Sequence, residues 1–529
     1  MMIRCERRPR PASGRLEVRS CTLAHMIRQL LVLLYVPLLY AHHPAMVPLT
    51  RPPMGWSTWY AFALQINETR VLEMAHVLKE EGFLAAGYSL IWLDDAWSAP
   101  ARDRYGRLYG DPDRFPHGIP WLVKELDTMG FSLGLYGNAA ARTCAGYPGQ
   151  LGHEYVDAQT IADWGVRAWK YDNCGHIDGK VALNIRGASS EGLDARPLPF
   201  VPGGGAWGEQ GEVFPWPLLP PGNGSFAPRV GAQLYQLQLY EAYRLFGDAL
   251  AEASAGRQRI TYAICPRIAG CDPSIMGFYA NVSDTSMNQC PQHDARDAWE
   301  GKGLLLENNA NSSTTWHLDN TFEYGVLEYS RPGFWHDLDY LQQGWKTIAG
   351  DCFWGTDGYC AGELQSAQEY RSQFAMWALM SVPLIVSFDA TAGSGRSVTD
   401  GMRRTLLNAD LIAINGDALV APLRRMATIA GHVELFSRTL VGGRLAMGLL
   451  NRDSAAAMNL TVRFDAVGWP SGQTAWVRDC WAGEDLGEMH GEIVVKHIDS
   501  HDSLVFILAP PQPHAPSSRA VGAVAAWTV

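Results

Sequence analysis

Eight short apolar segments alternate with helical patterns between residue 50 and about residue 415, and this alternation restricts the fold more than any other feature of the chain. Repeated βα units are typical of a parallel sheet. Eight of them in one domain predict a (β/α)8 TIM barrel of the α/β class. The predicted strands are Met54–Trp59, Tyr88–Asp94, Ser132–Gly137, Arg167–Asp172, Arg259–Cys265, Phe278–Asp284, Gly333–Leu338 and Pro383–Phe388.

From about residue 418 the pattern changes to short alternating strands. Val433–Leu440 and Arg444–Leu450 flank a Gly442–Gly443 turn and predict a hairpin. We therefore expect a C-terminal antiparallel β-sandwich domain after the barrel. The expected ranges are 46–417 for the catalytic barrel and 418–510 for the sandwich.

Two segments are poor candidates for regular structure. Residues 176–230, after the fourth predicted strand, are rich in Gly and Pro. In a barrel this insertion follows the C-terminal end of a strand, so a substrate lid and a disordered surface insertion are both open interpretations. The Pro/Ala-rich tail, residues 511–529, is predicted to be disordered.

The N-terminal segment resembles a signal peptide. Arginines precede the apolar run Leu30–Ala41, which is too short to span a bilayer. We expect residues 1–45 to form the signal peptide region. Either Met1 or Met26 could be the initiating methionine. The alternative interpretation of the apolar run is an uncleaved membrane anchor. The expected location is secreted, lysosomal or vacuolar, with no stable membrane association after cleavage.

The cysteine and sequon counts agree with an oxidising compartment. Eight cysteines lie outside the signal region, an even number, and none has the spacing of a zinc site. We therefore expect disulfide bonds and no metal. Five N-glycosylation sequons start at Asn67, Asn223, Asn281, Asn311 and Asn459.

The charge and the strand ends together favour a neutral polyol ligand. The net charge of −11 argues against a nucleic-acid partner. Carboxylates beside aromatic rings suit hydroxyl groups and the CH faces of a sugar. A metal site is the weaker alternative, because no His cluster or calcium-loop spacing accompanies these residues. The strand-end residues are Trp56, Trp59, Asp94, Asp95, Trp97, Tyr136, Asn138, Lys170, Asp172, Asn173, Asp337 and Asp339.

The segment KYDNC (170–174) contains the strongest candidate nucleophile, Asp172. A carboxylate at a strand end with Lys170 nearby is expected to remain ionised, as a nucleophile must. An ordinary salt bridge is the simpler interpretation of this tripeptide when it is taken alone.

The chain resembles the melibiase-type α-galactosidases, glycoside hydrolase family 27, through an ordered set of motifs from about residue 50 to 508. The matching runs are PPMGWSTW (52–59), LDDAW (93–97), GLYGN (134–138), RTCAGYPG (142–149), DAQTIADWGV (157–166), KYDNC, RPGFWHDLDYL (331–341), FAMWALMSVPLIVS (374–387), LLNADLIAINGD (406–417) and VRDCWAGEDLG (477–487).

The resemblance implies a role for each matched residue. Asp172 would be the nucleophile, and Asp94 and Asp95 would accept the O4 and O6 hydroxyls of the terminal sugar. Trp59 would pack against that sugar. The remaining implied pocket residues are Tyr136, Lys170 and Asp339, and the implied pocket-lining disulfide joins Cys144 and Cys174.

The second catalytic carboxylate, the general acid/base, is assigned from the run DARDAW (294–299), which keeps the family spacing and points to Asp294. The family's Arg four residues earlier is Cys290 here, so Asp284 stays open as the alternative. A retaining mechanism with these groups needs two carboxyl groups roughly 5–5.5 Å apart and no metal or organic cofactor.

Three departures from the family pattern concern stability and specificity. A family disulfide is absent because its two positions are Leu64 and Ala96. The family's Cys-Glu-Trp after the fifth strand is replaced, with Pro266 and Arg267 at the position that recognises the sugar's 2-substituent. Tyr340 stands where the family usually has Met.

The predicted function is therefore removal of terminal α-linked galactose by a retaining glycosidase. The alternatives are the same mechanism on an α-N-acetylgalactosaminide or a β-L-arabinopyranoside, and a catalytically silent carbohydrate-binding protein. The oligomeric state stays open, a homodimer included. For the other cysteines, the pairs Cys271–Cys290 and Cys352–Cys360 are plausible from proximity, which leaves Cys265 and Cys480 free.

Overall fold

The structure is a computed structural model that describes residues 49–173, 227–266, 279–287, 298–300, 313–341 and 365–511, with the side chains of the long helix after residue 226 described from Tyr240. Several predicted features lie outside these ranges. They are the signal region 1–45, most of the insertion 176–230, Asp294, nearly all of the tail, and the pairs Cys271–Cys290 and Cys352–Cys360.

The predicted barrel is confirmed. Eight parallel strands are ordered β7-β6-β5-β4-β3-β2-β1-β8. Leu341, just after β7, forms a parallel bridge with Val386 of β8, which closes the sheet on itself. The strands are β1 (Met54–Ser57), β2 (Leu90–Trp92), β3 (Ser132–Asn138), β4 (Ala168–Asp172), β5 (Thr261–Ile264), β6 (Thr285–Met287), β7 (Trp335–Asp337) and β8 (Leu384–Val386).

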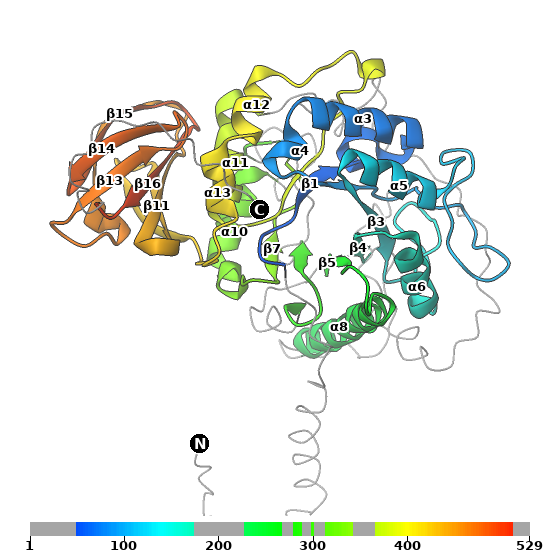
Figure 1. The fold of residues 1–529 in the computed structure, drawn as a ribbon. Helices are drawn as coiled ribbons and strands as arrows, with labels where there is room; N and C mark the ends of the chain where they lie inside the picture. Colours follow the sequence, from blue (N-terminus) through cyan, green and yellow to red (C-terminus); the bar gives the residue numbers. More distant parts are fainter. Residues whose placement is uncertain are drawn as a thin grey trace, which may run out of the picture. The chain divides into compact units, whose positions relative to one another are not determined.

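The helices lie outside the strands (Figure 1). The predicted apolar stripe of α3 is buried, with Val71, Met74, Ala75 and Leu78 all inaccessible to solvent. The helix ends two residues before Gly82, whose φ of 87° suits glycine. The helices of the barrel are α2 (Trp59–Phe62), α3 (Glu68–Glu80), α4 (Phe83–Ala86), α5 (Ile119–Met129), α6 (Glu154–Trp164), α8 (Ala227–Ala253), α10 (Thr314–Glu323), α11 (Ala367–Leu379), α12 (Asp400–Leu406) and α13 (Ala409–Asn415).

Seven of the eight predicted strands overlap the observed ones, and the sixth is wrong. The segment predicted as a strand, Phe278–Asp284, contains a turn in which Val282 N and Ser283 N both donate to the carbonyl of Tyr279. The strand β6 begins only at Thr285. Tyr279 and Val282 are nevertheless buried, so the apolar run reports burial correctly without specifying strand geometry.

The second domain is the expected antiparallel sandwich. Six strands are ordered β14-β13-β16-β11-β10-β9, and β12 pairs with β15. The predicted hairpin is confirmed, since Leu440 of β10 pairs with Arg444 of β11. These strands are β9 (Arg424–Ile429), β10 (Val433–Leu440), β11 (Arg444–Asn451), β12 (Ala457–Arg463), β13 (Thr474–Asp479), β14 (Glu484–His490), β15 (Glu492–Ile498) and β16 (Ser503–Ala509).

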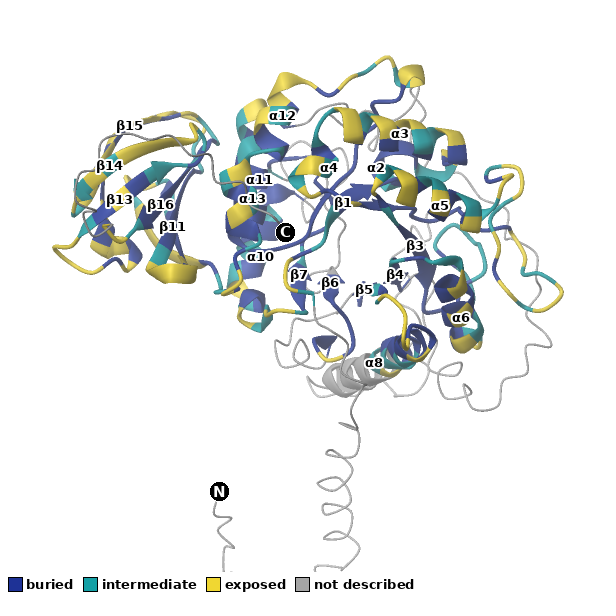
Figure 2. Cartoon of the chain, viewed as in Figure 1, coloured by how far each residue is buried: buried dark blue, intermediate teal, exposed yellow. Residues whose placement is uncertain are grey.

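Buried polar contacts join the sandwich to the barrel helices. Arg438 of β10 is 1% exposed and donates to the carbonyls of Leu379 at 3.2 Å and Ile414 at 2.9 Å. These carbonyls belong to the ends of α11 and α13, where a cation is favourable. Burial is extensive along the barrel strands and along β10, β11 and β16 of the sandwich, whereas β14 is largely exposed (Figure 2).

Candidate active site

The parallel strands bring the predicted site residues to one edge of the barrel. Asp172 is the last residue of β4 and pairs in register with Asn138, the last residue of β3. Asp94 follows β2 by two residues, and Asp339 follows β7 by two residues. The carboxyl ends of parallel strands share one face of a barrel, which is where such enzymes place their chemistry.

Tyr136 and Asn173 both donate hydrogen bonds to the carboxylate of Asp172. Tyr136 Oη donates to Asp172 Oδ2 at 2.8 Å, and the backbone N of Asn173 donates to Oδ1 at 2.6 Å. Burial, and then the charge of Asp172, raises the pKa of Tyr136 well above its usual value, so its hydroxyl keeps its proton and remains a donor. The carboxylate is thereby fixed in orientation, with 6% of the residue exposed.

Lys170 forms a buried ion pair with Asp94 at 2.8 Å. Burial alone would lower the pKa of Lys170, but the charge of Asp94 and of other nearby acidic groups outweighs it and raises that pKa well above its usual value. The segment KYDNC predicted that Lys170 acts on Asp172, whereas the hydrogen-bonded partners of Lys170 are Asp94 and Tyr340. Lys170 therefore influences Asp172 through space.

Asp95 is held by backbone donors from two loops. Its Oδ1 accepts from Ala96 N at 2.7 Å, and its Oδ2 accepts from Ala145 N at 2.8 Å. Burial raises the pKa of Asp95 to about 7, although these hydrogen bonds oppose the shift. The loop after β3 is thus attached to the loop after β2 through this one carboxylate.

Asp339 has a strained backbone and an aromatic neighbour that the sequence analysis missed. Its φ of 70° lies in the left-handed region, which non-glycine residues rarely adopt. Asp337 Oδ1 accepts from Asp339 N at 2.9 Å and supports this turn. Tyr60 Oη donates to Asp339 Oδ2 at 3.3 Å. Tyr60 directly follows the matched motif that ends at Trp59, and this adjacency is the sequence signal that would have pointed to Tyr60.

Trp59 packs in the same aromatic group as Tyr60 and Tyr340. This position is compatible with the expected flat face beside a sugar. The residues predicted for the nucleophile and the sugar pocket, namely Trp59, Asp94, Asp95, Tyr136, Lys170, Asp172 and Asp339, therefore lie in one connected region at the carboxyl ends of β1 to β4 and β7.

Asp284, the alternative acid/base, lies away from Asp172 and is already paired. It precedes β6, is fully buried, and forms an ion pair with Arg259. Its Oδ2 also accepts from Tyr262 N at 2.7 Å. Tyr262 pairs with Trp169, three residues before Asp172 along β4, so Asp284 lies about 10 Å below the level of Asp172. Asp294 lies outside the described residues.

The cysteines agree in part with the predictions. Cys144 is disulfide-bonded, and its predicted partner, Cys174, lies outside the described residues. The Sγ atom of Cys144 lies 3.2 Å from Asp172 Oδ2. Cys265 and Cys480 are both buried, and Cys480 forms no disulfide with the residues that the structure describes.

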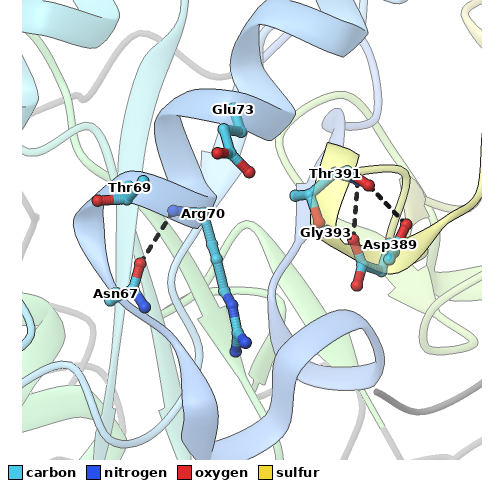
Figure 3. A pocket seen from close by; sticks show the side chains of 8 residues that line it. Asn67, Thr69, Arg70, Glu73, Asp389, Thr391 and Gly393 are labelled. Carbon is cyan, nitrogen blue, oxygen red and sulfur yellow. Dashed lines mark hydrogen bonds between the residues drawn. The ribbon is translucent and has the colours of Figure 1, made fainter. Parts of the chain in front are cut away.

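A separate cavity of about 390 Å³ lies between the start of α3 and the loop after β8 (Figure 3). Asp389 there accepts from the hydroxyl and the backbone N of Thr391, at 2.7 and 2.9 Å. The sequon residue Asn67 lines this cavity and caps α3 by accepting from Arg70 N at 2.9 Å. The cavity shares no lining residue with the carboxylate cluster, so it is distinct from the candidate site.

Comparisons with known proteins agree with this geometry. The family model described as "Alpha galactosidase A" matches residues 51–192, and that described as "Alpha galactosidase C-terminal beta sandwich domain" matches residues 430–508.

Individual relatives match most of the chain. An alpha-galactosidase of Cyamopsis tetragonoloba is 28% identical, over 87% of this chain and 86% of that protein. The alpha-N-acetylgalactosaminidase of Gallus gallus is 26% identical, over 87% of this chain and 91% of that protein. The crystal structure of alpha-galactosidase I from Mortierella vinacea has the same fold, with a TM-score of 0.65, 24% identity, and coverage of 87% of this chain and 97% of that one.

Proposed function

Since this chain belongs to the melibiase-type α-galactosidase family, we propose that it removes terminal α-linked galactose from oligosaccharides or glycoconjugates by a retaining, double-displacement mechanism. The observation that carries the proposal is the juxtaposition of Asp172 with hydroxyl-binding groups. A carboxylate oriented by Tyr136 and Asn173 shares one barrel edge with the Lys170–Asp94 pair.

In the first step, Asp172 attacks the anomeric carbon as the bond to the leaving oxygen breaks. Asp294 donates its proton to that oxygen, and a glycosyl ester of Asp172 forms. In the second step, Asp294 removes a proton from water, which attacks the anomeric carbon and releases Asp172. Two inversions retain the anomeric configuration, and neither step calls for a metal or an organic cofactor.

The remaining cluster residues would bind the sugar. Asp94 and Asp95 accept the O4 and O6 hydroxyls, and Trp59 packs against the ring. Lys170 uses two of its three N–H groups on Asp94 and Tyr340, which leaves one to donate to a sugar hydroxyl. Tyr136 and Asp339 complete the pocket wall.

The 2-position gives a second candidate substrate class. Pro266, two residues after β5, is buried and has no side-chain donor or acceptor for a 2-hydroxyl group. An α-N-acetylgalactosaminide, with an acetamido group at that position, is therefore the alternative substrate, and the relative from Gallus gallus carries a name of this kind.

The proposed route is the secretory pathway, ending in secretion or in a lysosome or vacuole after removal of residues 1–45. Among the residues that the structure describes, none of the helices is both long and apolar enough to cross a membrane. The disulfide at Cys144 agrees with an oxidising compartment.

The experiment compares 4-nitrophenyl α-galactoside with its 2-acetamido analogue and follows the product's anomeric configuration by NMR. We expect hydrolysis of the galactoside with an α-configured first product. Preferred hydrolysis of the acetamido sugar would reassign the substrate. A β-configured first product would contradict the retaining mechanism, and binding of sugar without hydrolysis of either substrate would favour a silent binding protein.

A further inference from the structure

Tyr340 closes a hydrogen-bonded triangle with Lys170 and Asp94. Tyr340 Oη donates to Asp94 Oδ2 at 2.9 Å and accepts from Lys170 Nζ at 2.9 Å. Lys170 Nζ also donates to the same Asp94 oxygen at 2.8 Å. All three residues are less than one tenth exposed, so water competes little for these positions.

The triangle fills one oxygen of Asp94. A carboxylate oxygen offers about two lone-pair positions. On Oδ2 they are used by Lys170 and Tyr340, while Oδ1 accepts from Asp95 N at 2.9 Å and keeps one position. A sugar hydroxyl therefore donates to Oδ2 only by displacing one of the two protein donors.

The ring of Tyr340 is held in place by its neighbours. Tyr60 packs edge-on against it, with ring centroids 5.8 Å apart and an interplanar angle of 81°. Lys170 Nζ lies 4.8 Å from the centroid of the same ring. Displacing the hydroxyl would require these contacts to change, so Tyr340 competes with a ligand as a pre-positioned group.

We propose that Tyr340 is a specificity-determining residue, whose hydroxyl takes the position on Asp94 that the primary hydroxyl on C6 of a galactose-configured sugar would use. The inference rests on the proposed function, in which Asp94 accepts a sugar hydroxyl. It follows that a hydroxymethyl group at C5 of the substrate raises kcat/KM less than it would if position 340 held an apolar residue.

Three substrates isolate the substituent at C5. They are the 4-nitrophenyl glycosides of α-D-galactopyranose, α-D-fucopyranose and β-L-arabinopyranose, which share a ring configuration and carry CH2OH, CH3 and H at C5. Tyr340→Phe removes only the competing hydroxyl. We expect the ratio of kcat/KM for the galactoside to that for the arabinopyranoside to rise about tenfold, because one hydrogen bond to a charged group becomes available. The kcat/KM for the fucoside, which also lacks a hydroxyl at C6, should respond to the substitution as that for the arabinopyranoside does.

Tyr60→Phe is the matched control. It removes a neighbouring tyrosine hydroxyl that donates to Asp339, so the ratio among the three substrates should stay as in the wild type. The Tm of each variant verifies folding. If Tyr340→Phe changed kcat/KM by the same factor for all three substrates, this inference would be overturned and the proposed function would stand. A wild-type protein inactive on all three would overturn the proposed function, and this inference with it.

Discussion

The two halves of the barrel contribute to the site in different ways. In the half formed by β1 to β4, Asp172 and Asp95 accept hydrogen bonds from the backbone of the very next residue, Asn173 and Ala96. In the half formed by β5 to β8, contributions are long-range: Tyr340 reaches Asp94 across 246 residues of sequence. Asp339 likewise pairs with Tyr60 across 279 residues.

The difference shows which parts of a site a local motif can specify. A carboxylate that accepts from its own neighbouring backbone is oriented by the turn that follows its strand. A group that bonds across the barrel depends on the closure of the whole sheet. We therefore expect changes in the first half to affect chemistry most directly, and changes in the second half to divide between chemistry, stability and specificity.

The largest effect is expected in the first half, for Asp172→Asn. Removing the proposed nucleophile should lower kcat by at least about 10⁴-fold, because an amide does not form the glycosyl ester. The assay is hydrolysis of 4-nitrophenyl α-galactoside, with Tm and circular dichroism to show that the fold is intact. A folded variant with a near-normal rate would reject the assignment.

The second half should show a smaller but still catalytic effect for Asp294→Ala. Loss of the general acid/base is expected to lower kcat by about 10²–10⁴-fold. Azide, which needs no general base, should restore turnover and yield a glycosyl azide of retained configuration. Asp297→Ala, three residues along the same motif, is the control. An unaltered rate in Asp294→Ala would show that another residue is the general acid/base.

Asp284→Asn should separate stability from chemistry. It removes the buried charge that pairs with Arg259, so we expect a loss of about 3–5 kcal/mol in the free energy of unfolding. The kcat should stay within about threefold of the wild type, since Asp284 lies away from the reacting groups. Asp163→Asn breaks an ion pair with Arg257 that is about half exposed, and it should cost about 0.5 kcal/mol or less. A large loss of kcat in a stable Asp284→Asn protein would restore it as a catalytic candidate.

The smallest expected effect is a pH dependence in the first half. The pKa of Asp95 is raised to about 7 in the folded protein, so between about pH 4 and pH 7 the native state binds a proton that the unfolded state releases. Its contribution to stability therefore falls as pH rises through this window. Between pH 5 and pH 7 the fall is at most about 3 kcal/mol.

Denaturant unfolding at these two pH values measures this contribution. The decrease in stability should be smaller in Asp95→Asn than in the wild type. Asp103→Asn should leave the decrease unaltered, because hydrogen bonds from Arg107 and Tyr105 lower the pKa of that partly exposed carboxylate. Equal decreases in the wild type and Asp95→Asn would show that Asp95 does not titrate in this range.

The sequence alone determined the barrel, the sandwich and the identity of the residues at the strand ends. It did so because burial alternates with a period that belongs to strands or helices, and because parallel strands bring their carboxyl ends to one face. Asp94, Asp95, Lys170 and Asp172 therefore lie in one cluster, as predicted.

Only the tertiary structure decided which group bonds to which. The apolar run before Thr285 is buried in a turn as well as it would be in a strand, so the sequence misplaced β6 and, with it, Asp284. Lys170 was expected to serve Asp172 and instead pairs with Asp94. Tyr340 reaches that pair from the loop after β7. Hydrogen-bond partners depend on distances of a fraction of an ångström between distant segments, and a local sequence pattern does not encode them.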